Sequence, residues 1–383
     1  MTSRRAHLAL ADGTVFAGVA CGAQGVASGE VVFTTGMTGY QEVLTDPSYC
    51  GQIVTMTAPH IGNTGINDED TESVDGAPQV AGFVVRDMSV AFSNWRAKES
   101  LIDYLARHRV VAISDLDTRK LTRHIRDRGV QNGAIGTEDP SSLVDRARSA
   151  EPMEGLDLVS RVSPRAPYAF SETRQSWNVG FDVRRYGPAG EKPTHGLHVV
   201  AIDYGAKRNI LRCLVDLGCR VTAVPAQYSA EKILELSPDG IFLSNGPGDP
   251  AAVGYAVRTI QSLLGKRPIF GICLGHQLLA LALGARTYKL KFGHRGLNQP
   301  VKDLSTGRVE ITTQNHGFVV DVASTGKNIT TTHLHLNDGT SEGLEAPDAR
   351  AFSVQYHPEA AAGPHDALYL FERFGQAMRS GAL

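Results

Sequence analysis

The chain has 383 residues, enough for two domains, and its 42% of hydrophobic residues is sufficient for buried cores. Its 38 basic and 40 acidic residues leave a net charge of -2, which argues against a protein built around nucleic-acid binding. The 5 cysteines form no C-x-x-C pair, and the sequence contains neither a leader-like apolar segment nor a stretch long enough to span a bilayer, so we expect a cytoplasmic protein without disulfides, bound metal or a membrane anchor.

The first 150 residues are dominated by short segments that are expected to be strands. Residues 6–10 and 14–18 flank Asp12-Gly13, a pattern typical of a β-hairpin. Further elements follow: strands are expected over residues 30–34, 52–56, 80–86 and 110–114, and helices over 98–107 and 115–128. Residues 1–150 therefore predict a strand-rich α/β domain.

The helix expected over 115–128 carries a group of basic residues, namely Arg119, Lys120, Arg123, Arg126 and Arg128. Such a helix could bind phosphate or RNA, or it could present a solvated charged face. We favour the solvated face, because Asp115, Asp117 and Asp127 lie among the basic residues and no aromatic side chains alternate with them.

Residues 151–194 contain repeated Pro and Gly breakers and few apolar runs, so we place a linker there. From 195 to 383, strand and helix segments alternate, which is typical of a mostly parallel sheet with helices on both faces. Strands are expected over residues 198–202, 220–224, 239–244, 268–272, 309–313, 330–335, 343–345 and 351–356, and helices over 207–217, 229–236, 253–264, 274–283 and 366–378. Residues 195–383 therefore predict a second α/β domain.

The strand expected over 268–272 runs into Gly271-Ile-Cys273-Leu-Gly275 and then into a helix. This order of strand, tight turn and helix is typical of a nucleophile elbow, here with Cys as the nucleophile. The N-terminus of the helix would favour a thiolate at Cys273 through its dipole. Most free cysteines are buried core residues, but the flanking glycines argue against that alternative.

A base for this thiol is expected in His357-Pro358-Glu359, at the end of the last strand. Residues i and i+2 of an extended segment face the same side, so Glu359 can orient His357 while His357 accepts the thiol proton. His276 is an alternative base, although a side chain at that position of a helix start would point past the thiol. His333-x-His335 has a spacing found in metal sites but no evident third ligand, which favours a partly exposed pair on a strand.

Gly246-Pro-Gly248-Asp249-Pro-Ala251 follows another expected strand and satisfies the dinucleotide-binding fingerprint G-x-G-x-x-G/A. We reject that interpretation, because two prolines remove backbone donors and Asp249 would repel a pyrophosphate. Glycine N–H groups beside a thiol suit an oxyanion hole better, where one donor is worth about 3 kcal/mol. The Walker pattern is absent, so no ATP site is expected in this chain.

Together, residues 244–250, 271–277 and 357–359 closely resemble the class I (triad) glutamine amidotransferases. The first half narrows this resemblance. Its segments 35–49, 58–65 and 117–123, with 291–296 and 313–318 further along, are similar to those of the small subunits of carbamoyl phosphate synthetases.

The resemblance implies a glutamine-hydrolysing ligase subunit. Cys273 would attack the side-chain amide of L-glutamine and form a glutamyl thioester, His357 would be the general base and acid, and Glu359 would orient it. The N–H groups of Gly246 and Leu274 would form the oxyanion hole. Glutamine would be bound by a further set of residues, Ser48, Gly248, Gln277, Asn315, Gly317 and Phe318, with Ser48 coming from the first domain.

The same resemblance implies a hetero-oligomer in which ammonia passes to a separate large subunit. That subunit would hold ATP and Mg and would make carbamoyl phosphate from bicarbonate for arginine and pyrimidine synthesis, while this chain would carry no cofactor. Amidotransferases of anthranilate or GMP synthesis are rival families, but they lack a counterpart of residues 1–190. A non-catalytic scaffold is opposed by the intact Cys273, His357 and Glu359.

Overall fold

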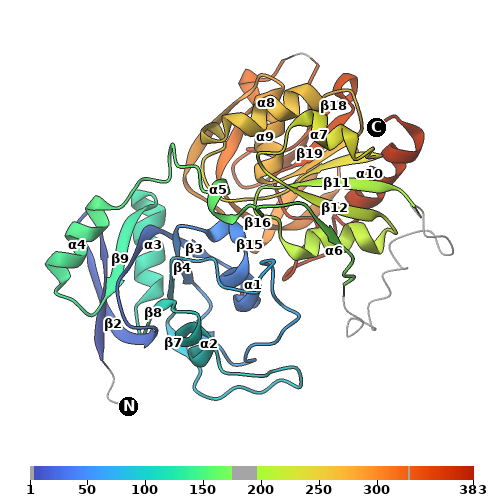
Figure 1. Ribbon diagram of the computed structural model, residues 1–383. Helices are drawn as coiled ribbons and strands as arrows, with labels where there is room; N and C mark the ends of the chain where they lie inside the picture. Colours follow the sequence, from blue (N-terminus) through green and yellow to red (C-terminus); the bar gives the residue numbers. More distant parts are fainter. Residues whose placement is uncertain (1–3, 175–195, 327) are drawn as a thin grey trace. The chain divides into compact units, whose positions relative to one another are not determined.

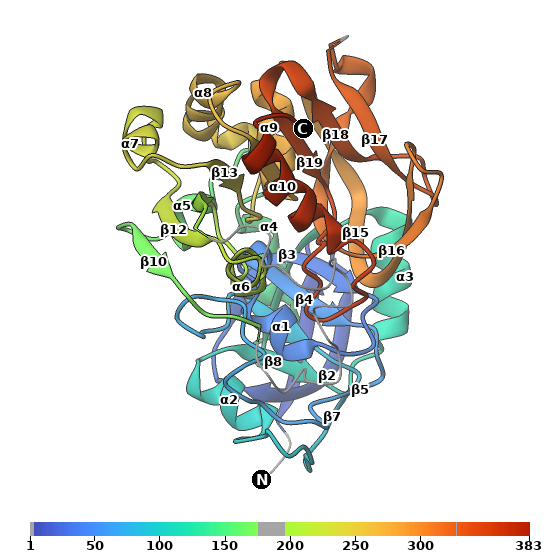
Figure 2. The same cartoon turned by 90° about the vertical axis from the view of Figure 1, so that its right-hand side faces the viewer.

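The computed structural model describes residues 4–174, 196–326 and 328–383, which fall into two compact units (Figures 1 and 2). The first unit runs to Leu156 and also includes Lys291–Gly296, and the second contains the rest of the described chain. Part of the linker expected over 151–194, including its Pro- and Gly-rich residues 187–193, lies outside the described residues. The described residues from Asp157 onward belong to the second unit, apart from Lys291–Gly296.

The first unit is built on a closed barrel with the strand order β1-β2-β8-β6-β4-β3-β9. Its strands are β1 (Arg5–Leu10), β2 (Val15–Gly22), β3 (Ala27–Thr34), β4 (Gln52–Met56), β6 (Gly82–Val84), β8 (Val111–Ser114) and β9 (Gln131–Gly136). The short strands β5 (His60–Ile61) and β7 (Asp87–Met88) pair with each other. The helices are α1 (Tyr40–Thr45), α2 (Leu101–Arg107), α3 (Thr118–Arg128) and α4 (Pro140–Ser149), with a 3-10 turn over Pro47–Tyr49.

Strand β9, which closes the barrel between β1 and β3, was not expected from the sequence. Its composition explains why, since Gly133 and Gly136 weaken the strand pattern. A Cβ on Gly133 would lie 2.5 Å from the side chain of Val31, so the glycine permits the close approach of β9 to β3. Closure of the barrel therefore depends on a position where the sequence pattern is weakest.

The second unit contains a ten-stranded sheet in the order β10-β12-β11-β13-β14-β19-β18-β17-β15-β16. Its strands are β10 (Tyr168–Phe170), β11 (His198–Asp203), β12 (Arg220–Pro225), β13 (Gly240–Leu243), β14 (Ile269–Ile272), β15 (Arg286–Asp303), β16 (Val309–Asp321), β17 (Thr330–His335), β18 (Ser341–Ala346) and β19 (Ala351–Val354). The helices are α5 (Val159–Val162), α6 (Arg208–Asp216), α7 (Ala230–Glu235), α8 (Gly254–Leu263), α9 (Leu274–Ala282) and α10 (Tyr369–Ser380). Strands β12, β11, β13, β14 and β19 are parallel, and β10, β18 and β17 extend the sheet with antiparallel pairs.

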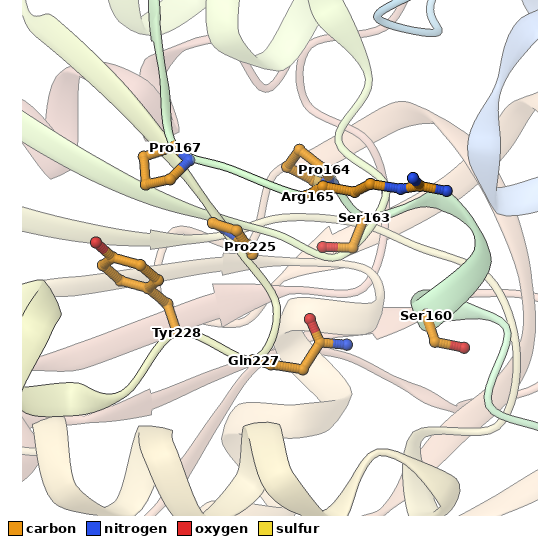
Figure 3. Close-up of a pocket in the computed structure, with 8 residues that line it drawn as sticks. All are labelled: Ser160, Ser163, Pro164, Arg165, Pro167, Pro225, Gln227 and Tyr228. Carbon is orange, nitrogen blue, oxygen red and sulfur yellow. The ribbon is translucent and has the colours of Figure 1, made fainter.

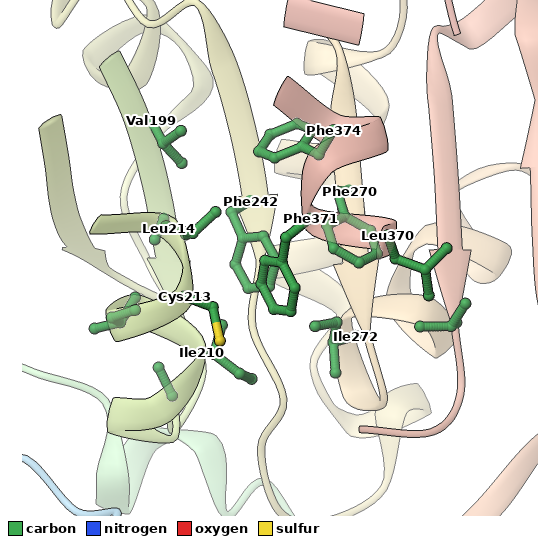
Figure 4. Packing of buried hydrophobic residues seen from close by; sticks show 14 of the residues in the cluster. Val199, Ile210, Cys213, Leu214, Phe242, Phe270, Ile272, Leu370, Phe371 and Phe374 are labelled. Atoms are coloured by element: carbon green, nitrogen blue, oxygen red, sulfur yellow. The ribbon is translucent and has the colours of Figure 1, made fainter. Parts of the chain in front are cut away.

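Helices cover both faces of the parallel strands, because alternate side chains of each strand point to opposite sides. Val199 of β11 and Phe270 of β14 pack with residues of α6 and α10 on one face. Val200 and Ile269 pack with residues of α7, α8 and α9 on the other. Figure 4 shows the first of these clusters, in which Phe371 of α10 lies against the central strands.

The long strand β15 was not expected and β16 was expected only over 309–313. Residues Lys291–Gly296 of β15 belong to the first unit, where the N–H of Val130 donates to the carbonyl of Lys291 at 2.9 Å. Their polar and glycine-containing sequence lacks the alternation that would have marked a strand. Among the described helices, none has the length and apolar character needed to cross a membrane.

Replacing Phe270 by Ala should destabilise the second unit strongly. Phe270 is fully buried, stacks on Phe352 at 4.5 Å between ring centroids, and meets three further rings edge-on or tilted. Loss of such a side chain typically costs about 3–5 kcal/mol. Urea unfolding measures this change. Tyr288→Ala, at a residue that is 46% exposed, is the control and should cost about 0.5 kcal/mol or less; equal losses in the two variants would contradict the packing described here.

Candidate active site

Cys273 lies at a tight turn between β14 and α9. It has φ 54° and ψ -104°, a strained backbone for a residue with a Cβ, and it is only 2% exposed. A Cβ on Gly275 would lie 2.2 Å from the carbonyl oxygen of Leu243, and one on Gly271 would lie 2.8 Å from the carbonyl oxygen of Gly275. The two glycines are therefore required by close backbone contacts, and the turn between them places the thiol at the N-terminus of α9.

His357 and Glu359 lie together just beyond β19. Nδ1 of His357 is 2.7 Å from Oε1 of Glu359, and both side chains are almost completely buried. The N–H of His357 donates to the carbonyl of Thr313 at 2.9 Å, which fixes the backbone of the histidine to β16. Because Glu359 occupies Nδ1, Nε2 is the nitrogen left for the thiol of Cys273, and this buried nitrogen makes no hydrogen bond to any described residue.

Lys207 completes a buried row of charges that the sequence analysis did not identify. Its Nζ donates to Oε1 of Glu359 at 2.9 Å and to the carbonyl of Ala360 at 3.0 Å, and the lysine side chain is 4% exposed. Asn209, near the start of α6, donates to the carbonyl of Glu359 at 2.7 Å. Lys207 occupies the N-cap of α6, where a cation is unfavourable, and that anomaly is the signal that could have identified it.

The charges in this row shift each other's pKa values. Burial alone would lower the pKa of His357, but the Glu359 carboxylate outweighs it and raises that pKa to about 10, with Lys207 opposing and Cys273 contributing. Burial would raise the pKa of Glu359, but Lys207 and His357 lower it to about 2. The carboxylate is therefore ionised at neutral pH and favours a protonated imidazole next to the thiol.

The residues predicted to form the oxyanion hole lie beside each other. Leu274 follows Cys273 directly, and a Cβ on Gly246 would lie 2.8 Å from the Leu274 side chain and 2.4 Å from the carbonyl of Tyr204. Asn245, next to Gly246, accepts a hydrogen bond from the N–H of Lys207 at 3.0 Å. The loop after β13 is thus tied both to the elbow and to the start of α6.

Strand β16 brings several of the predicted glutamine-binding residues to the same place. The thiol of Cys273 contacts the carbonyl of Asn315 at 3.5 Å. Gln277 is buried, and its Nε2 donates to the carbonyl of Phe318 at 2.7 Å and to the Gln355 side chain at 3.0 Å. Gly317 lies between these contacts on β16. The amide of Gln277 therefore anchors the strand next to the nucleophile.

The other predicted glutamine-binding residues are Gly248 and Ser48. Gly248 lies in the loop after β13 with φ 92°, a conformation that favours glycine. Ser48 belongs to the first unit, where its N–H donates to the Asp46 carboxylate at 2.9 Å. Its contact with glutamine stays a prediction.

The other histidines considered in the sequence, His276, His333 and His335, have structural partners. Nδ1 of His276 is 2.9 Å from the hydroxyl of Ser353, and burial lowers the pKa of His276 to about 3, so it is a poor base for the thiol. The expectation that His333 and His335 are partly exposed was wrong, since they are 3% and 1% exposed. Residues i and i+2 of a strand share a face, and this face of β17 is buried, where His333 contacts Thr332 and His335 contacts Gln299.

A pocket of about 380 Å³ lies in the second unit where the chain after α5 passes the end of β12 (Figure 3). It is lined by Ser160, Ser163, Pro164, Arg165, Pro167, Pro225, Gln227 and Tyr228. None of these residues belongs to the set around Cys273. The Ser163 hydroxyl bridges the carbonyl of Asp203 and the N–H of Ala226, so this residue also joins the ends of β11 and β12.

Comparison with known proteins gives similarity along the whole chain. A family model described as "Carbamoyl-phosphate synthase small chain, CPSase domain" matches residues 8–135, and one described as "Glutamine amidotransferase class-I" matches residues 200–377. The carbamoyl phosphate synthase small chain of Syntrophotalea carbinolica is 56% identical over 98% of this chain and 98% of that protein. The protein of the same name from Escherichia coli O6:H1 is 54% identical, over 97% of this chain and 96% of that protein. A crystal structure of a glutamine amidotransferase from Thermotoga maritima is 18% identical, with a TM-score of 0.35, and covers 49% of this chain and 94% of that one.

The charge row should make stability depend on pH in the alkaline range. A pKa of His357 raised from 6.5 to about 10 contributes stability that is complete below pH 6.5 and is lost as the pH rises to about 10. Glu359→Gln removes the carboxylate that raises this pKa. We therefore expect the stability advantage of the natural chain over Glu359→Gln, measured by urea unfolding, to shrink between pH 6.5 and 10.

The control for this series is Glu345→Gln. Glu345 pairs with Arg373 at 2.9 Å in the same unit, so this substitution also removes a paired carboxylate but leaves the contact of Glu359 with His357 in place. Its stability difference from the natural chain should stay flat. A flat profile for Glu359→Gln as well would contradict the charge assignment.

Proposed function

This chain belongs to the family of carbamoyl-phosphate synthase small chains, and from that premise we propose that it hydrolyses L-glutamine through Cys273, His357 and Glu359 and delivers the ammonia to a separate large subunit. The class I glutamine amidotransferase domain expected from the motifs is confirmed, and the chain is a glutamine-hydrolysing carbamoyl-phosphate synthase subunit. The observation that carries the proposed mechanism is the thiol at the strained turn, next to an imidazole held by a buried carboxylate.

In the first step, Sγ of Cys273 attacks the side-chain amide carbon of glutamine. The thiol proton is already held on Nε2 of His357, because the raised pKa of this imidazole favours an imidazolium beside a thiolate, and the amide oxygen acquires negative charge as the thiolate attacks. His357 then donates its Nε2 proton to the amide nitrogen, the C–N bond breaks, and ammonia leaves. The product on the protein is a glutamyl thioester.

In the second step, water attacks the thioester carbon and gives a proton to His357. The C–S bond breaks, glutamate leaves, and the proton stays on His357 beside the thiolate of Cys273. The sum of the two steps is one glutamine and one water converted to one glutamate and one ammonia, so the starting pair of thiolate and imidazolium is regenerated.

The charge row supports this assignment of roles. Glu359 is held ionised by Lys207 and accepts the Nδ1 hydrogen of His357, which fixes the ring with Nε2 toward the thiol. The backbone N–H groups of Gly246 and Leu274 would stabilise the oxyanion, and one such donor is worth about 3 kcal/mol.

Glutamine itself would be held by a set of residues around the thiol and, from the first unit, by Ser48. In the second unit this set consists of Gly248, Gln277, Asn315, Gly317 and Phe318. The contacts of Asn315 with Cys273 and of Phe318 with Gln277 support a binding role for this stretch of β16.

The ammonia would be used on the large subunit, which would bind ATP and Mg and convert bicarbonate to carbamoyl phosphate for arginine and pyrimidine synthesis. The name "small chain" of the relatives supports such a partner. We place this hetero-oligomer in the cytoplasm, where its substrates are made, with no cofactor bound to the small chain.

Cys273→Ser should abolish glutamine-dependent carbamoyl phosphate synthesis by the assembled enzyme and leave the ammonia-dependent reaction intact. A serine hydroxyl is a much weaker nucleophile than a thiolate when the base is tuned for a thiol. The measurement is carbamoyl phosphate formation with glutamine or with ammonium as nitrogen donor.

Cys213→Ser is the matched control, since Cys213 is buried in the same hydrophobic cluster as Cys273 and lies on α6. It should retain synthesis with both donors. Glutamine use that survives in Cys273→Ser would refute the mechanism proposed here.

A further inference from the structure

Strand β16 contacts the catalytic residues and their neighbours at four points along its length. The carbonyls of Thr313, Asn315 and Phe318 accept hydrogen bonds from His357, Cys273 and Gln277 respectively. The fourth contact is made by a side chain, because Oε2 of Glu310 accepts a hydrogen bond from the hydroxyl of Tyr356 at 3.3 Å. Tyr356 is the residue directly before His357.

Glu310 is an unusual residue to find at this place. Glu310 is only 1% exposed. This burial disfavours the charged carboxylate and therefore raises the pKa of the Glu310 carboxyl group. Tyr369 of α10 interacts with the same carboxyl group. The other charged groups that face it are Asp303 of β15 and Arg308 before β16.

Tyr356 is also fixed by its surroundings. It is fully buried and belongs to the same hydrophobic cluster as Cys273. Its ring stands edge-on to that of His333, with 5.7 Å between centroids. The hydroxyl at the end of this ring therefore reaches Glu310 through a packed environment that leaves the tyrosine little freedom.

We propose that Glu310 and Tyr356 are a pair of positioning residues that hold His357 at the correct distance from Cys273. This inference rests on the proposed function and adds residues that do not touch glutamine. The two ties from β16, Glu310 to Tyr356 and Thr313 to His357, act on adjacent residues and fix the chain just before the imidazole.

Loss of the Glu310–Tyr356 hydrogen bond should affect the rate of the chemical step more than the binding of glutamine. Loosening Tyr356 would let the backbone of His357 shift, while the glutamine-binding end of β16 would stay anchored by Gln277. Small misplacements of a catalytic group lower the rate of the chemical step strongly. Loss of the pair should therefore lower kcat and leave KM nearly unchanged.

The test uses the full chain with glutamate release as the assay. In Tyr356→Phe we expect kcat to fall about tenfold with KM within about twofold, and alkylation of Cys273 by iodoacetamide at fixed pH to slow as well. Glu310→Leu should behave in the same way, whereas Glu310→Gln, which still offers an oxygen to the tyrosine, should restore kcat to within about twofold of the natural chain. If the pair served folding alone, these variants would have lower melting temperatures, and Glu310→Leu and Glu310→Gln would have the same kcat.

Tyr255→Phe is the matched control. Its hydroxyl contacts the Asp157 carboxylate at 3.3 Å in the same unit, so the substitution also removes a tyrosine–carboxylate contact, but from a residue outside the set around Cys273. It should leave kcat and alkylation unchanged. The inference is overturned if Tyr356→Phe matches Tyr255→Phe, or if Glu310→Leu and Glu310→Gln have equal kcat.

Cys273→Ser is measured in the same series, so that a failure of the proposed function can be distinguished from a failure of the positioning role of Glu310 and Tyr356. Hydrolysis that persists in Cys273→Ser refutes the proposed function, whatever the tyrosine variants do. An inactive Cys273→Ser together with an unaffected Tyr356→Phe refutes only the positioning pair.

Discussion

The active site depends on one steric constraint, the close approach of the turn after β14 to the end of β13. The carbonyl of Leu243 occupies the space where a side chain at position 275 would begin, so the chain can turn there only with glycine. That turn forces Cys273 into a conformation with φ 54° and starts α9 immediately behind it. The strained backbone, the position of the thiol and its place at a helix N-terminus are thus three results of a single contact. Strain of this kind persists only where the surrounding structure fixes it, and here two buried parallel strands do so.

A buried row of charges supplies what the turn alone lacks. Isolated charges are costly in a protein interior, but Lys207, Glu359 and His357 are joined end to end by short contacts and by the Ala360 carbonyl. Breaking such a row leaves an uncompensated charge and typically costs about 3–5 kcal/mol. Compared with well-packed apolar side chains in the same place, the intact row adds little net stability, because the cost of burying the charges offsets their attraction. It does set the ionisation of Glu359 and the orientation of His357, which are the properties that the chemistry needs. The same logic applies to Glu310, whose buried carboxyl group is better explained by positioning than by stability.

The parts of the site that could be predicted from the sequence are those that depend on neighbours along the chain. Gly271 and Gly275 flank Cys273 at fixed spacing, and His357 and Glu359 are two residues apart on an extended segment, so their geometry follows from local backbone rules. Lys207 and Glu310 lie 152 and 46 residues from their partners Glu359 and Tyr356, and no local pattern reveals such pairs. The fold divides in the same way. The parallel strands and their covering helices have clear periodicity, whereas β9 and β15 contain glycines and polar residues whose strand conformation depends on the sheet that surrounds them.

The central claim is that Cys273 forms a covalent glutamyl intermediate, and the most direct measurement is mass spectrometry of the chain after rapid mixing with glutamine and acid quenching. We expect a transient glutamyl adduct on the peptide that contains Cys273, labile to mild base as a thioester is, and absent from Cys273→Ser. We also expect the adduct to accumulate and decay on the time scale of glutamate release. Glutamine hydrolysis at the normal rate without any adduct on that peptide, or with an adduct on another residue, would contradict a covalent role for Cys273.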